Sequence, residues 1–322
     1  MLAELLTTQP KKPSKLVGEA FAPSNIALIK YWGKRDLILN LPITNSLSIS
    51  LGEKGARTRI SLNSANQNTV LLNGHLIAHD SAFYKRLSDF LDSIKPDPQQ
   101  FYNVETTMNL PVAAGLASSA CGFAALVKAF ADLYNWDIPE PILSILCRMG
   151  SGSACRSLWQ GFVEWHAGER ADGLDSFAAP LPYTMPDLAI GLCILSSAEK
   201  PISSREAMRR TVETSTLYES WPKQVMFDLA EIKQALENQD FHNMGCIAER
   251  NALAMHATML ATAPAVCYFL PETVAIMHKI WKLRAEGLSV FFTEDAGPNI
   301  KILARQTDIQ FINQQIESID WV

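Results

Sequence analysis

The segment that most constrains this chain runs from Pro111 to Phe123 and consists of small or apolar residues without a charged side chain. It leads directly into an apolar helical pattern that continues to Ala131. A loop of small residues at a helix start directs several unpaired N–H groups to one point, where the helix dipole adds positive potential. Such a site binds anions, and polyphosphate above all. A tightly packed helix start has the same composition, so the segment alone leaves both interpretations open.

Two serines in this segment extend the phosphate interpretation. Ser118 and Ser119 lie near the expected helix cap, where a hydroxyl can close the helix or reach a phosphate and its metal ion. No Lys-Ser or Lys-Thr pair follows the glycine, so the segment is not a Walker A loop.

Composition restricts the class of protein. The 322 residues are 48% hydrophobic and 19% charged, which is typical of a globular chain with a sizeable core. A net charge of -5 argues against nucleic acid as the main partner. The longest apolar run, Leu188 to Leu195, is too short to span a bilayer, and no signal-peptide core follows the lysines near the N-terminus. We expect a cytoplasmic protein without a membrane partner.

The cysteines and histidines show no metal-binding pattern. The six cysteines are scattered without a C-x-x-C pair, which is typical of free thiols in a reducing compartment. The six histidines lack ligand spacing, so we expect no metal held by His or Cys. No Ser/His/Asp or Cys/His constellation can be assembled from spacing.

Near the N-terminus, residues 22–36 place Asn25, Tyr31, Lys30 and Lys34 in an otherwise apolar segment. If the segment were helical, the two lysines would share a face and would repel each other unless an anion lay between them. A solvated surface pair is the alternative, which the flanking apolar residues disfavour.

Hydrophobic periodicity predicts a mixed α/β fold. Clean alternation predicts a strand at 42–51, and a continuous apolar run predicts one at 188–196. Further strands are expected at 19–23, 57–63, 69–73, 101–108, 161–165 and 288–293. Helical spacing behind Asp80 and Ser81 predicts a helix through Ile94, and three helical stripes fill residues 225–281.

Three further segments carry chemistry-bearing side chains. Ser151, Gly152 and Ser153 form a second cluster of backbone donors, and Arg156 follows one helical turn later with a fork suited to carboxylate or phosphate. Residues 200–205 form a loop of cations and hydroxyls that includes Ser204. Asp295 follows a predicted strand, a common position for an active-site carboxylate, although an acidic turn residue before glycine is equally ordinary.

Five blocks together resemble the diphosphomevalonate decarboxylase family of the GHMP kinase superfamily. The blocks are 25–36, 42–51, 111–123, 150–165 and 292–299, in the family's order and nearly end to end. Lys-Tyr-Trp-Gly-Lys, Gly-Ser-Gly-Ser-Ala-Cys-Arg-Ser and Asp-Ala-Gly-Pro-Asn are the most specific motifs. The Lys200–Met208 loop departs from the family pattern, because Ala207 replaces an expected glycine.

The resemblance implies an activity: ATP phosphorylates the 3-hydroxyl of mevalonate 5-diphosphate, and phosphate and carbon dioxide then leave to give isopentenyl diphosphate. It assigns Asp295 as the base, Lys30 as the cation beside it, and Arg156 with Asn25 as the grip on the substrate carboxylate. The diphosphate would be held by Tyr31, Lys34, Ser151, Gly152, Ser153 and Ser204. The ATP phosphates would be held by Gly115, Ala117, Ser118 and Ser119, with Ser119 the candidate contact for Mg²⁺.

The resemblance also implies an architecture. An N-terminal domain similar to ribosomal protein S5 domain 2 would occupy residues 1–185, with a loose arm at 1–17, and a ferredoxin-like C-terminal domain would occupy residues 186–322. The active site would lie in the cleft between them, and the family's members are commonly homodimers.

Other functions stay open at this stage. A decarboxylase of the monophosphate, or a mevalonate 3-kinase that stops after phosphorylation, would keep the same fold. Asp295 and Arg156 together argue against the pure kinase, and Tyr31, Lys34 and Ser204 favour the diphosphate. A protein that binds anions without catalysis is the remote alternative.

Overall fold

One long strand, β4 (Ser46–Asn63), organises the first half of the chain in the computed structural model, which describes residues 6–110, 118–198 and 200–322. Along one edge, β1 (Gly18–Ile29) pairs with β4 in antiparallel register. On the other edge, β7 (Phe101–Met108) and β8 (Phe162–Trp165) pair with opposite ends of β4. The long strand therefore joins both parts of one sheet.

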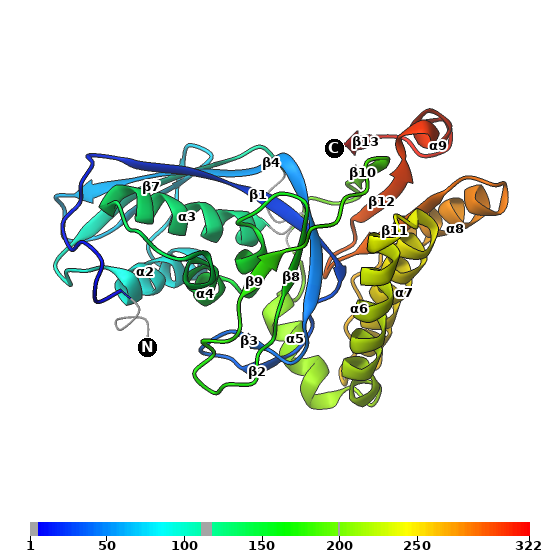
Figure 1. Ribbon diagram of the computed structural model, residues 1–322, viewed down its shortest axis with the longest axis horizontal. Coiled ribbons are helices and arrows are strands. Elements are labelled where there is room, and N and C mark those ends of the chain that lie inside the picture. The colour runs from blue at the N-terminus through cyan, green and yellow to red at the C-terminus, as the bar shows by residue number, and fades with distance from the viewer. Residues whose placement is uncertain (1–5, 111–117, 199) are drawn as a thin grey trace.

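Short strands complete this sheet and helices cover it (Figure 1). The strand order is β6-β5-β7-β4-β8-β9, with β1 on β4. The short strands are β5 (Thr69–Leu72), β6 (His75–Leu76) and β9 (Ala178–Pro180), and a separate ribbon joins β2 (Lys34–Asp36) to β3 (Leu41–Pro42). The helices are α2 (Ala82–Ile94), α3 (Ser118–Tyr134) and α4 (Glu140–Gly150), followed by the 3-10 turn η1 (Gly152–Arg156).

The second half of the chain forms a smaller antiparallel sheet in the order β11-β12-β10-β13, with helices packed against it (Figure 1). Its strands are β10 (Leu188–Cys193), β11 (Val290–Glu294), β12 (Ile300–Arg305) and β13 (Ile319–Trp321). Its helices are α5 (Ser204–Thr214), α6 (Trp221–Glu237), α7 (Phe241–Leu260), α8 (Pro271–Ala285) and α9 (Ile309–Gln315), with 3-10 turns η2 (Tyr218–Ser220) and η3 (Gln306–Asp308).

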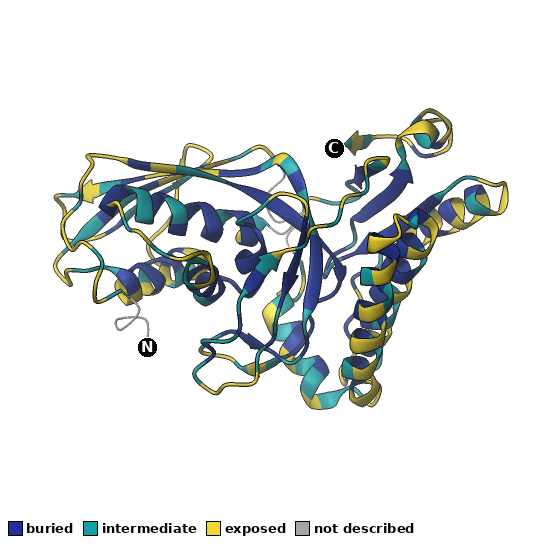
Figure 2. Cartoon of the chain, viewed as in Figure 1, coloured by how far each residue is buried: buried dark blue, intermediate teal, exposed yellow. Residues whose placement is uncertain are grey.

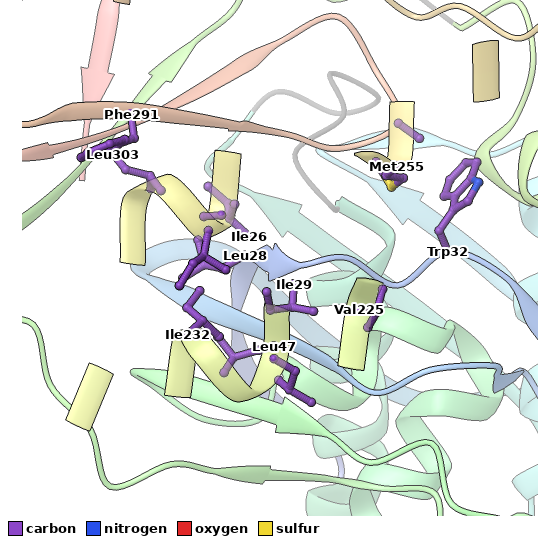
Figure 3. Close-up of a cluster of buried hydrophobic side chains, with 14 of the residues drawn as sticks. Ile26, Leu28, Ile29, Trp32, Leu47, Val225, Ile232, Met255, Phe291 and Leu303 are labelled. Atoms are coloured by element: carbon purple, nitrogen blue, oxygen red, sulfur yellow. The ribbon is translucent and has the colours of Figure 1, made fainter. Parts of the chain in front are cut away.

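A shared apolar core joins the two halves. Ile26, Leu28 and Ile29 of β1 lie in one buried cluster with Val225 and Ile232 of α6 (Figure 3). Figure 2 shows the strands between the halves buried, while the outer faces of the helices are exposed. The C-terminal end of β1 is therefore fixed against the second half of the chain.

The structure confirms the mixed α/β class and most predicted elements, and it extends several of them. The strands predicted at 42–51 and 57–63 fall largely in one strand, β4, which begins at Ser46 and whose pairing with β1 shifts register between Ser50 and Gly55. Ser81 caps α2 as predicted by accepting from the Tyr84 N–H. The cysteines are free, as predicted, although Cys246 is only partly buried and Cys267 is exposed.

Lys30 and Lys34 do not share a helix face, because the segment that joins them is not helical. Lys30 follows the last residue of β1, and Lys34 begins β2. Between them, Gly33 has φ = 115°, a conformation that a helix excludes and that favours glycine. Tertiary contacts override the local spacing, because the Trp32 carbonyl accepts from both Tyr218 Oη and Trp221 Nε1.

The packing of α7 on β11 gives a prediction about stability. A Cβ at Gly245 would lie 2.1 Å from a ring carbon of Phe291, which is buried. We expect Gly245→Ala to lower the free energy of unfolding by about 1–3 kcal/mol through overpacking. Urea denaturation would measure the change.

Gly122→Ala is the matched control. Gly122 also lies in a helix, but its added Cβ would meet only the flexible end of Met108, at 3.0 Å. We expect this variant to be neutral or stabilised by up to about 1 kcal/mol, because alanine favours helix. Equal effects of the two substitutions would contradict the account.

Candidate active site

A cleft of about 470 Å³ lies between the two halves. The end of β1, the start of α3 and η1 line one side, and residues 200–208, Met255 and the turn after β11 line the other. Among the described residues, six basic side chains and one carboxylate, Asp295, line this cleft. The basic residues are Lys30, Lys34, Arg86, Arg156, Lys200 and Arg205. Such a lining attracts an anionic ligand even though the whole chain is acidic.

Asp295 lies between two buried lysines. Lys30 Nζ is 2.8 Å from Asp295 Oδ1, and Lys301 Nζ is 3.3 Å from Oδ2. The lysine side chains are 2% and 0% exposed, whereas the Asp295 side chain is 24% exposed and faces the cleft. The lysines therefore contact the carboxylate on its buried side, and a ligand in the cleft can reach its exposed side.

Electrostatics keep this carboxylate ionised. Burial raises the pKa of Asp295, but the positive charges and hydrogen bonds of Lys30 and Lys301 outweigh it and hold the pKa well below its usual range. Burial lowers the pKa of Lys30 to about 8, against the opposing effect of Asp295. The pair can accept a proton at Asp295 and present a positive charge at Lys30.

Buried hydrogen bonds position Lys30. Its backbone N–H donates to Asn251 Oδ1 at 2.8 Å, and Asn251 Nδ2 donates to Asp228 Oδ2 at 2.7 Å. Asn251 and Asp228 are fully buried on α7 and α6. The second half of the chain thus fixes the point where β1 ends and its side chains enter the cleft.

Arg156 lies at the floor of the cleft. Its Nη1 donates to Ser46 Oγ on β4, its guanidinium lies 5.8 Å from the ring centroid of Trp165, and its Nε has no hydrogen-bond partner among the described residues. Ser46, the first residue of β4, is therefore buried against Arg156. Asn25 lies nearby on β1 and donates from Nδ2 to Ser157 Oγ at 2.7 Å.

A close contact joins Tyr31 to the 150–153 turn. Tyr31 packs edge-on against Trp165, with ring centroids 4.7 Å apart. A Cβ at Gly152 would lie 2.8 Å from Tyr31 Oη, so only glycine fits here. The Tyr31 hydroxyl is buried without a hydrogen-bond partner in the described part of the chain. Ser151 and Ser153 line the same part of the cleft.

Lys34 and Arg86 add two cations beside this turn. Lys34 Nζ donates to Asn40 Oδ1 at 2.5 Å, and Arg86 Nη2 donates to the Gly150 carbonyl at 2.7 Å. Burial, and then the charge of Arg205, lower the pKa of Lys34 to about 8 and that of Arg86 to about 10. Unbalanced cations of this kind are typical of a site that awaits an anion.

Ser118, Ser119 and the 200–208 segment form the remaining part of the cleft lining. Ser118 and Ser119 begin α3 and line the cleft, and Ser119 Oγ is 3.4 Å from Ser151 Oγ. Gly115 and Ala117 lie outside the described residues. Lys200 Nζ donates to Ser204 Oγ and to the Ala296 carbonyl, both at 2.8 Å.

Ala207, the departure from the family pattern, lies in α5 and is fully buried in the core. An alanine in the first turns of a helix needs no special backbone conformation. This substitution is therefore compatible with a helix at that point.

The cleft brings together every described candidate residue and adds Arg86 and Asn40, which the sequence analysis missed, as it missed Lys301, the buried partner of Asp295. Arg86 lay inside an amphipathic helix pattern, and Asn40 lay in a short turn. Lys301 lay within an apolar strand, where a lone lysine between isoleucines was the available signal. Among the described residues, no group of three or more His, Cys, Asp or Glu side chains could hold a metal ion. No helix in the described ranges is long and apolar enough to cross a bilayer.

The two-part α/β architecture, with a helix start and six basic side chains lining the cleft between its halves, is that of the GHMP kinase fold. Residues 22–178 match the diphosphomevalonate decarboxylase-like N-terminal domain, and residues 190–319 match the mevalonate 5-diphosphate decarboxylase C-terminal domain. The chain therefore belongs to the diphosphomevalonate decarboxylase family.

Individual relatives agree. The diphosphomevalonate decarboxylase of Aspergillus fumigatus is 37% identical over 92% of this chain and 79% of that sequence. The crystal structure of mevalonate diphosphate decarboxylase from Staphylococcus aureus has a TM-score of 0.89 at 35% identity, covering 95% of this chain and 94% of that one. A structure of MDDEF in complex with MVAPP, AMPPCP and magnesium has a TM-score of 0.88 at 36% identity, covering 95% and 96%.

The Tyr31–Gly152 contact gives a prediction about anion binding. We expect Gly152→Ala to displace the Tyr31 ring and to weaken binding of inorganic pyrophosphate by about tenfold or more, since overpacking costs about 1–3 kcal/mol. Isothermal titration calorimetry would measure the affinity. Gly122→Ala, which adds the same methyl group outside the cleft, should bind as the parent does, and unchanged binding by Gly152→Ala would contradict the prediction.

Proposed function

We propose that this chain catalyses the ATP-dependent decarboxylation of mevalonate 5-diphosphate to isopentenyl diphosphate, ADP, phosphate and carbon dioxide. The observation that carries the proposal is the single carboxylate, Asp295, held ionised by two lysines in a cleft otherwise lined by cations. Phosphoryl transfer to a tertiary alcohol needs a group that orients the hydroxyl and cations that stabilise the charged transition state.

In the first step, Asp295 accepts the proton of the 3-hydroxyl as the oxygen attacks the terminal phosphorus of ATP and ADP leaves. Lys30 Nζ, 2.8 Å from the carboxylate, stabilises charge on the transferring group. In the second step, the bond from carbon 2 to the carboxylate breaks, its electron pair forms the carbon–carbon double bond, and the 3-phosphate leaves. Carbon dioxide is released in the same step.

Arg156 is suited to the carboxylate that is lost. Its guanidinium is buried and held by Ser46, and its Nε is left without a partner in the described part of the chain. Asn25, anchored on Ser157, lines the same part of the cleft. Together they would orient the carboxylate so that its bond can break.

The substrate diphosphate fits the cationic end of the cleft. Lys34, Tyr31 and the 151–153 turn offer an ammonium, an unpartnered buried hydroxyl and serine hydroxyls, and Ser204 approaches from the other half of the chain. Arg86 joins this group on the same side. A diphosphate has one more phosphate group and more negative charge than a monophosphate, so it would balance these cations better.

ATP would lie at the start of α3, where Ser118 and Ser119 line the cleft and Gly115 and Ala117 precede them in sequence. Asp295 is the one carboxylate among the described residues that line the cleft, and two lysines already contact it. The described residues therefore fit a Mg²⁺ ion that enters the cleft bound to the nucleotide. When bound, the ion would neutralise phosphate charge, with Ser119 as a hydroxyl contact.

The alternative functions are not favoured. A 3-kinase would not require Arg156 to orient the substrate carboxylate for its loss. An inactive anion-binding protein would not require the Lys30–Asp295 pair. The relatives bear the name of the diphosphate decarboxylase. Homodimer formation, the cytoplasmic location and the domain limits at residues 185 and 186 stay predictions.

A paired assay tests the function. Purified protein would be given ATP, Mg²⁺ and mevalonate with either one or two 5-phosphates, and release of ADP and of carbon dioxide would be followed together. We expect equal release of both products and a preference for the diphosphate. ADP without carbon dioxide would make the protein a 3-kinase, and no turnover would overturn the proposal.

Asp295→Asn tests the role of the carboxylate. The amide keeps the size of the side chain but cannot accept the proton, so we expect kcat to fall about 10²–10⁴-fold. Binding of the diphosphate should be retained, because its contacts lie on Lys34 and the 151–153 turn. Unaltered kcat would show that Asp295 is not the base.

A further inference from the structure

A second carboxyl group lies directly behind the Asp295 site. Glu294 is the last residue of β11 and is fully buried. Neither of its side-chain oxygens has a hydrogen-bond partner among the described residues. His256 Nε2 lies 3.7 Å from Glu294 Oε2. A buried carboxyl group without donors disfavours its charged form.

Two residues of α7 face Glu294 without balancing its charge. The His256 Nε2 atom bonds with the main-chain carbonyl of Asp295 at 3.2 Å, and its ring stacks on Phe269 at 4.4 Å. Burial, with the charge of Lys30, lowers the pKa of His256 to about 3, so the ring is neutral. Glu249 is engaged by Arg284 at 2.7 Å and by Trp281 at 2.8 Å.

Among the described residues, the other charged groups that act on Glu294 are Lys30, Lys301 and Asp295. Both lysines are buried, and Asp295 is the carboxylate that contacts them. With Glu294 protonated, this cluster carries two positive charges and one negative charge. With Glu294 ionised, the cluster carries two positive and two negative charges.

The titration of Glu294 and of Lys30 falls in one range. Burial raises the pKa of Glu294 to about 8, although Lys30 and Lys301 oppose the rise. Burial lowers the pKa of Lys30 to about 8, and the charges of Asp295 and Glu294 oppose that fall. Each group therefore stabilises the charged form of the other.

We propose that Glu294 is a positioning residue for the reaction: it carries a proton in the resting site and, on losing it, keeps Lys30 charged and makes Asp295 a stronger base. This inference rests on the proposed function, because it concerns the same Lys30–Asp295 pair. A like charge near Asp295 raises its proton affinity, and an opposite charge near Lys30 preserves the ammonium. Glu294 thereby extends the active range toward alkaline pH.

Infrared spectroscopy tests the proton on Glu294 without turnover. We expect the wild-type protein to show the carbonyl band of a protonated carboxylic acid at neutral pH, and the band to disappear as pH rises through about 8. Glu294→Gln should lack the band. Glu164→Gln is the matched control, because Glu164 is equally buried but paired with Lys233 at 2.8 Å. It should keep the band.

The pH dependence of kcat tests the consequence for the reaction. Below the titration range, Glu294→Gln mimics the protonated glutamic acid, so its kcat should equal that of wild type. Above the titration range, the kcat of the variant should fall at a pH about one unit lower than the kcat of wild type does. At a given pH on the falling limb, the variant's kcat should then be about tenfold lower. Glu164→Gln should follow the wild-type profile.

The outcomes separate the two proposals. A chain without decarboxylase activity would overturn the proposed function, and the infrared titration would still report on Glu294. Absence of the protonated band at neutral pH, or superimposable pH profiles for wild type and Glu294→Gln, would overturn the inference. If Glu294→Gln did not fold, the wild-type infrared titration would decide alone.

Discussion

The contact of two buried lysines with Asp295 is the interaction on which the rest of this structure depends. Lys30 belongs to the first half of the chain, whereas Asp295 and Lys301 belong to the second. The cluster therefore forms only when the two halves are packed together. The shared core of β1 with α6 and α7 produces that packing, and Figure 3 shows the side chains that make it.

Buried charges are unfavourable unless partners and hydrogen bonds offset their desolvation. Here the offset is distributed over several elements. Asn251 fixes the backbone of Lys30, His256 fixes the carbonyl of Asp295, and the two lysines share its carboxylate. The cations at the other end of the cleft have no comparable set of carboxylates among the described residues. The protein thus maintains a net positive cleft that an anionic substrate completes.

The sequence was informative where local chemistry decides the structure. Alternation indicated part of β4, and Asp80 and Ser81 marked the start of α2. The family resemblance implied a common site for Asp295, Arg156 and Lys30, which line one cleft. The sequence failed where partners distant in sequence decide. The Lys30–Lys34 spacing left a helix open, but Tyr218 and Trp221 donate hydrogen bonds to the Trp32 carbonyl and the segment is not helical. No local pattern reveals that Lys301 and Glu294 meet Lys30, more than 260 residues away.

The most direct test of the central claim is the ionisation of Asp295 itself, by carbon-13 NMR of protein labelled at the aspartate carboxyl carbons, with Asp295→Asn to assign the resonance. Two buried lysines should keep Asp295 ionised where ordinary aspartates become half protonated, at about pH 3.9. The account predicts a resonance that stays at its ionised position as the other aspartates titrate. A resonance that titrates along with them would contradict it.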